Sequence, residues 1–235
     1  DRNIKTRFFD LFFDKIFSKN SRSDIIPGEV NCAMYSIGIF ATTKSLKNIM
    51  NIDQEMRRQC NVTYLPYTSP EHLEFLYKQN MDQFDGFLFG GSYPYEVLCS
   101  VFGKMQKPYA YFNISDRDYY KLIATLLVQD PHTDFSRVYF DIPDTPVDFR
   151  SIFGKDGVPY LSEAPIDWDH VDPYDWYQPL KDYYLQVWDS GKVDLLVIRF
   201  GSLDDFLDRH QIRHIYLAPS TESMLETFRG LMMQL

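Results

Sequence analysis

The chain has 235 residues, of which 45% are hydrophobic, 17% aromatic and 24% charged. This composition excludes disordered, collagen-like and coiled-coil proteins, and it supplies enough apolar side chains for one large domain or two smaller lobes. The formal net charge of −9 argues against direct binding of nucleic acid by these residues, because phosphate contacts need an excess of lysine and arginine.

Residues 1–18 predict an amphipathic helix, since Ile4, Phe8, Leu11 and Ile16 recur at helical spacing and further phenylalanines widen the apolar face. Residues 19–28 are rich in Ser and Asn, end in Pro-Gly and predict a linker. The helix either packs on its own domain or serves in dimerisation or signalling. The first residue is not Met and the last five are mostly apolar, which we expect of a fragment whose partner domain lies outside it.

From residue 34 onward, short apolar strand segments alternate with helical segments. Strands are predicted at 34–41, 62–66, 85–89, 109–113, 137–142, 159–162, 193–200 and 215–218. Helices are predicted at 44–59, from 70, and at 95–104, 116–129, 147–153, 177–190, 203–210 and 221–233, with Thr42-Thr43 and Ser69-Pro70 as start signals.

This alternation predicts parallel βαβ units and therefore an α/β fold. About four strands fall in each half, which favours two Rossmann-like lobes with an interlobe cleft. We expect an N-terminal helix and linker over 1–28, a first lobe over 29–136 and a second lobe over 137–235. The nearly continuous apolar run at 193–200 is typical of a strand that is buried on both faces.

In open parallel sheets, ligands bind at the carboxyl ends of the strands, where the following helices begin with unpaired N–H groups. The residues at these positions are rich in hydroxyls and small side chains, which allow close approach and hydrogen bonding to a polar ligand. Ser and Thr here are also ordinary helix caps, so the prediction depends on the whole set converging. The predicted ligand-binding residues are Thr42, Thr43, Lys44, Gly91, Ser92, Tyr93, Asn113, Ser115, Asp116, Arg199, Phe200, Ser202 and Ser220.

Two segments carry a family resemblance: the strand and turn Asp85-Gly-Phe-Leu-Phe-Gly-Gly-Ser92, and Lys107-Pro-Tyr-Ala-Tyr-Phe-Asn-Ile-Ser115. With the later strands VDLLVIRFGS and HIYLAPSTESMLETF, residues 34–233 resemble the N-terminal sensory domain of the propionate-catabolism activator family of bacterial transcription regulators. The resemblance implies a small effector between two lobes and an adjoining domain that acts on DNA or transcription. The higher aromatic content and an Asp/Trp/Pro-rich stretch at 163–176 depart from the family and put its ligand in doubt.

The strand YSIGIF and the segment FDGFLFGG also resemble, more weakly, the sugar-repressor and periplasmic-binding family. Two-lobed amino-acid racemases share the layout, but they need one catalytic thiol from each lobe. Cys32, Cys60 and Cys99 all lie in the first half, which removes that mechanism. Their odd number, without a Cys-x-x-Cys pair, predicts buried thiols in a reducing compartment.

Three functions remain open at this point. We expect a cytoplasmic sensing domain that binds a small polar effector, forms a dimer through the N-terminal helix and reaches DNA only through a domain outside this chain. An enzyme on the same scaffold, such as a hydrolase using Asp116 or Asp141, is the first alternative. The second is a protein-interaction module that uses the Phe-rich helix and the 163–176 stretch. No metal or cofactor is expected, since Gln211-Ile212 predicts a turn between His210 and His214 and the two histidines would not share a helical face. No membrane insertion is expected, since no apolar run reaches about 18 residues.

Overall fold

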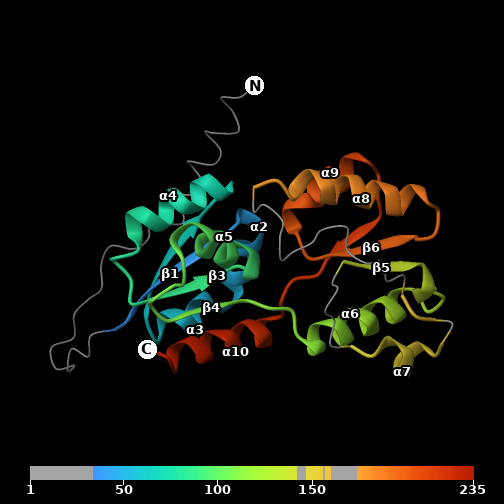
Figure 1. The fold of residues 1–235 in the computed structure, drawn as a ribbon. Coiled ribbons are helices and arrows are strands. Elements are labelled where there is room, and N and C mark those ends of the chain that lie inside the picture. The colour runs from blue at the N-terminus through green and yellow to red at the C-terminus, as the bar shows by residue number, and fades with distance from the viewer. Residues whose placement is uncertain (1–33, 142–146, 156, 160–173) are drawn as a thin grey trace. The chain divides into compact units, whose positions relative to one another are not determined.

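The computed structural model describes residues 34–141, 147–155, 157–159 and 174–235. The predicted helix at 1–18, the linker at 19–28 and most of the stretch at 163–176 lie outside the described residues, as does most of the predicted strand at 159–162. Within the described residues, seven strands form two parallel sheets. The α/β prediction is therefore confirmed (Figure 1).

The first sheet has the order β2-β1-β3-β4, and all its neighbours are parallel. β2 lies on one side of β1 and β3 on the other, so the strand order reverses between β1 and β3. Parallel α/β sheets bind ligands at such a switch point, which the residues that follow β1 and β3 flank. The strands are β1 (Ser36–Ala41), β2 (Asn61–Pro66), β3 (Gly86–Phe89) and β4 (Tyr109–Tyr111).

Alternation of side chains gives the first sheet two buried faces. Ile37, Ile39 and Leu88 point to one face, and Phe40 and Phe87 point to the other. The phenylalanine face packs on α4 (Pro70–Asn80) and α5 (Ser92–Phe102), whereas the isoleucine face packs on α2 (Thr43–Ile49), η1 (Met50–Ile52) and α3 (Asp53–Arg57).

The second sheet has the order β5-β6-β7, again with parallel neighbours. Its strands are β5 (Val138–Phe140), β6 (Leu195–Ile198) and β7 (His214–Tyr216). Every residue of β6 is buried, as the continuous apolar run predicts. One face packs on α8 (Tyr177–Asp189) and α9 (Asp204–Arg209), and the other on α7 (Phe149–Phe153).

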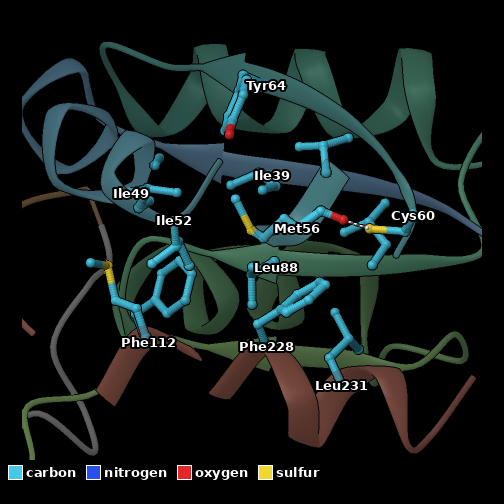
Figure 2. Close-up of a cluster of buried hydrophobic side chains, with 14 residues drawn as sticks. Ile39, Ile49, Ile52, Met56, Cys60, Tyr64, Leu88, Phe112, Phe228 and Leu231 are labelled. Carbon is cyan, nitrogen blue, oxygen red and sulfur yellow. Dashed lines mark hydrogen bonds between the residues drawn. The ribbon is translucent and has the colours of Figure 1, made fainter. Parts of the chain in front are cut away.

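Two helices do not pack with the sheet that is nearest in sequence. α6 (Asp116–Gln129) follows the last strand of the first sheet, yet its Tyr119 and Ile123 share a core with Phe140 of the second sheet. α10 (Thr221–Met232) follows the last strand of the second sheet, yet Phe228 and Leu231 pack against Leu88 and neighbouring residues of the first sheet (Figure 2). The division at 136/137 remains a prediction, but the packing of these helices does not follow chain order.

Most predicted elements appear within a few residues of their expected bounds. The helix predicted at 44–59 is interrupted by the 3-10 turn η1, and α5 begins at Ser92 instead of residue 95. Pro94 is tolerated in α5 because the first turn of a helix has no N–H that must be paired within the helix. Of the cysteines, Cys60 is buried and Cys99 is half-buried, while Cys32 lies outside the described residues.

Candidate functional site

The loop after β1 begins with a helix cap. Thr42 Oγ1 accepts a hydrogen bond from the backbone N–H of Ser45 at 3.3 Å, and the Thr42 carbonyl accepts from Leu46 N–H at 2.9 Å. This pairs groups that a helix start otherwise leaves without partners. The cap starts α2 directly after the strand, and it places Lys44 in the first turn of that helix.

Lys44 forms an ion pair with Asp204, which follows β6 and η3 (Gly201–Leu203). The second Asp204 oxygen, Oδ1, lies 3.6 Å from His214 Nε2. A Cβ added to Gly201 would lie 2.8 Å from Lys44 Cγ and 3.0 Å from the Tyr216 ring, so a larger residue here would require these side chains to shift. The loops after β1 and β6 therefore meet at the Lys44–Asp204 pair.

Aromatic side chains make a second contact between the strand ends. Tyr93, in the first turn of α5, packs edge-on against Trp176 at 4.9 Å between ring centroids. Trp176 also contacts Phe200 at 4.6 Å and Tyr177 at 4.7 Å. We call Tyr93, Trp176, Tyr177 and Phe200 the aromatic layer. Trp176 is almost completely buried, so water is excluded from the centre of this layer.

A buried tyrosine lies close to this layer. Tyr67 follows β2, and burial is the main cause that raises its pKa, with further contributions from the neighbouring Tyr93, Tyr177 and Tyr216. Burial also raises the pKa of Tyr177 and Tyr216, so the phenol groups of Tyr67, Tyr177 and Tyr216 stay neutral and can act as both donors and acceptors toward a polar ligand.

A buried carboxylate follows β5. Asp141 is 2% exposed, and Tyr184 from α8 donates a hydrogen bond to its Oδ2. Arg199 Nε lies 3.9 Å from the same oxygen. Burial raises the pKa of Asp141 to about 6, against the opposing effects of Arg199 and Tyr184. Arg199 therefore serves first to compensate this charge.

The two segments that connect the sheets are joined by a second buried carboxylate. Asp118 Oδ2 accepts from Ser115 N–H at 2.8 Å, and its Oδ1 accepts from Ser220 N–H at 3.0 Å. Ser115 Oγ lies 2.8 Å from Ser223 Oγ. Ser115 caps α6 and Ser220 caps α10. We call Ser115, Asp118, Ser220 and Ser223 the crossover group.

The predicted site residues separate into three places. Lys44, Tyr93 and Phe200 take part in the contacts between strand ends, with Thr42, Thr43, Gly91, Ser92 and Ser202 in the same loops. Ser115 and Ser220 belong to the crossover group, with Asn113 and Asp116 exposed in the adjoining segment. Arg199 faces Asp141. The predicted Gly91 has open space where a side chain would lie, whereas a Cβ added to its neighbour Gly90 would lie 2.8 Å from Ala41 Cβ.

The sequence reasoning missed several partners. Asp204, His214 and Tyr216 were not predicted, although Asp204 comes only two residues after Ser202 and carries the charge that complements Lys44. Trp176 was placed in the 163–176 stretch and Tyr177 at the start of the helix predicted at 177–190, and neither was predicted as a site residue, but both take part in the aromatic layer. An acidic residue just after a predicted ligand-facing turn is the signal that could have found Asp204.

Two hollows lie near these groups. A narrow cavity of about 10 Å³ is lined by Ser45, Gly90, Phe112 and Tyr216, among others, and has room for about one water molecule. A wide, shallow hollow involves Ser115 and Asp116, with Arg117, Tyr120, Lys121 and Glu226. Among the described residues, no three His, Cys, Asp or Glu side chains gather as metal ligands, and no helix is long and apolar enough to cross a membrane.

Comparisons with known proteins add a likeness in fold. No family model and no curated protein matches the chain. The structure is similar to the crystal structure of an NtrC family transcriptional regulator from Clostridium acetobutylicum, with a TM-score of 0.57 and 10% identity over 86% of this chain and 97% of that chain. A solute-binding protein of an ABC transporter system from Conexibacter woesei matches at a TM-score of 0.29 and 14% identity, over 82% of this chain and 74% of that chain. At 10% identity the first match shows a shared fold alone. The TM-score of the second match is too low to show a shared fold.

Proposed function

We propose that residues 34–235 form the ligand-sensing domain of a transcription regulator, which binds a small polar molecule between two lobes. The observation that carries this proposal is the meeting of the strand-end loops from both sheets at the Lys44–Asp204 pair and the aromatic layer. Parallel α/β sheets bind ligands at this end. The likeness in fold to the Clostridium regulator supports the regulatory role.

The proposed activity is binding without turnover. The two carboxylates considered for hydrolysis are placed differently from a catalytic pair: Asp116 is exposed at the start of α6, and Asp141 is buried with Tyr184 and Arg199. Signalling would follow from a change in the angle between the lobes, which the ligand favours by contacting both. The predicted N-terminal helix would pass this change to a dimer partner or to an attached DNA-binding domain.

A thermal-shift screen of small metabolites tests the proposal. We expect at least one polar metabolite to raise the melting temperature of the wild type and to remain chemically unchanged by NMR after incubation. Phe200→Ala should weaken this stabilisation, because Phe200 belongs to the aromatic layer. Phe75→Ala is the matched control, since Phe75 is 60% exposed on α4.

Two results would count against sensing at this place. A metabolite that stabilises wild type and Phe200→Ala equally binds elsewhere, and a metabolite that is converted supports the enzyme alternative. Small-angle scattering with the ligand adds a separate readout, since closure of the lobes should reduce the radius of gyration.

A further inference from the structure

We infer that the ligand is a small zwitterion, of which an α-amino acid is the simplest example, with its carboxylate on Lys44 and its ammonium group on Asp204. This inference rests on the proposed function, because it names the ligand class of the same site. Its basis is that the meeting point of the strand ends holds one cation from the loop after β1 and one anion from the loop after β6. A molecule with both charges can pair with Lys44 through its carboxylate and with Asp204 through its ammonium group, so neither residue is left without an opposite charge.

The two members of the pair differ in how easily a ligand reaches them. The Lys44 side chain is 41% exposed, whereas the Asp204 side chain is 16% exposed. Lys44 has a long, flexible side chain and can turn toward a ligand carboxylate, while Asp204 is fixed at the start of α9. The anion that receives the ligand is therefore preorganised, and the cation adjusts to it.

An anionic ligand alone fits this position poorly. If it took Lys44 away, the mostly buried Asp204 would lose its cation, which is strongly unfavourable. His214 does not replace that cation when neutral: its Nδ1 lies 2.8 Å from the Ile212 carbonyl and so carries the hydrogen, which leaves a lone pair on the Nε2 that faces Asp204 Oδ1. Oδ1 is buried and makes no hydrogen bond among the described residues. A ligand ammonium group supplies the missing donor and the missing charge together.

The surroundings suit the rest of such a molecule. The Tyr216 ring already lies 5.9 Å from the Lys44 ammonium group, so an aromatic face is available to a cation at this point. The aromatic layer belongs to the same apolar cluster as Tyr216, so it offers apolar contacts to a ligand side chain. An amino acid with an apolar or aromatic side chain matches both parts.

The experiment compares three ligand classes on the intact chain by thermal shift and calorimetry: the twenty free α-amino acids, a set of dicarboxylates and a set of neutral sugars. We expect an amino acid to bind, and its methyl ester and N-acetyl derivative to bind at least about tenfold more weakly, because each blocked form lacks one of the two charges. Lys44→Met and Asp204→Asn should each cause a loss of similar size.

Matched controls lie next to each residue. Lys47→Met on α2 and Asp205→Asn on α9 remove an exposed charge of the same sign and should leave affinity within about twofold. The double variant Lys44→Asp/Asp204→Lys keeps an ion pair with its polarity reversed, and should fold but bind the amino acid weakly. If the single variants fail to fold, binding of the methyl ester and the N-acetyl derivative to the wild type still tests whether both charges of the ligand are needed.

The outcomes separate the two proposals. Binding of a dicarboxylate or a sugar that Phe200→Ala weakens leaves the sensing function standing and overturns the zwitterion. Equal binding of the free and blocked amino acid, or equal losses in the control variants, also overturns it. If no member of any class binds, the zwitterion is overturned and the sensing function loses its support.

Discussion

Asp141 shows how one buried residue makes the stability of the protein depend on pH. Burial raises its pKa from an ordinary value of 3.8 to about 6, in spite of Arg199 and Tyr184. The folded state thus binds a proton more tightly than the unfolded state. A carboxyl group of this kind stabilises the fold most at low pH, and its contribution falls as pH rises from about 4 to about 6.

Asp141→Asn tests this sign, because asparagine imitates the protonated carboxyl group. We expect the free energy of unfolding of the variant, measured with urea and taken relative to wild type, to rise by up to about 3 kcal/mol between pH 4 and pH 7. Glu222→Gln, an exposed carboxylate on α10, is the control and should show no such rise. A difference that is flat with pH would mean that Asp141 is ionised throughout this range.

At the scale of elements, local sequence signals located most strands and helices. Ser69-Pro70 marks the start of α4, and the bounds of α6 match the prediction. The packing partners of the helices could not be predicted in this way, because an amphipathic pattern shows that one face of a helix is buried but not against which sheet. The destinations of α6 and α10 depend on side chains distant in sequence, such as Phe140 for α6 and Leu88 for α10.

Phe228→Ala measures the importance of α10 for the first sheet. Phe228 is fully buried, so we expect its truncation to lower the free energy of unfolding by about 4 kcal/mol. Met233→Ala is the control, since Met233 is 88% exposed and should change stability by less than about 0.5 kcal/mol. Hydrogen exchange should accelerate in β1 and β3 more than in β6. Equal acceleration in both sheets would show that α10 does not stabilise the first sheet specifically.

At the scale of the whole molecule, two described segments connect the sheets, one passing through Ser115 and the other through Ser220. The crossover group joins these two segments by hydrogen bonds. The hydrogen bonds lower the pKa of Asp118, although its burial acts in the opposite direction. The stabilisation that Asp118 provides is therefore present at neutral pH, and it is lost as pH falls through its folded-state pKa.

Asp118→Asn removes the charge that accepts from both backbone N–H groups. We expect a loss of about 3 kcal/mol at pH 7, and less at low pH, in urea unfolding. Asp116→Asn is the control, because Asp116 is exposed in the same helical turn and should cost under about 1 kcal/mol. Equal effects of the two substitutions would reduce Asp118 to an ordinary helix-terminal charge.

The candidate site was predictable in part, for a related reason. Parallel topology places strand ends at one edge, so Lys44, Tyr93 and Phe200 could be named from the strands they follow. Sequence position did not indicate that Ser115 and Ser220 are joined through Asp118 and Ser223, because these hydrogen bonds form only where the two connections lie side by side. Asp204 was missed because its significance depends on Lys44, 160 positions earlier in the chain.

Because α10 packs on the first sheet, it determines which residue ranges must be expressed together to obtain that sheet by itself. Residues 34–113 and 218–235 together supply that sheet and the helices on its two faces, so the intervening stretch is topologically an insertion. A truncated gene ending at residue 113 would express a first sheet without α10, which exposes the apolar side chains that α10 covers and makes the product prone to aggregation. A fusion that bridges residue 113 to residue 218 with a short flexible spacer would keep the covering helix, and is the version to express when the first sheet is wanted by itself.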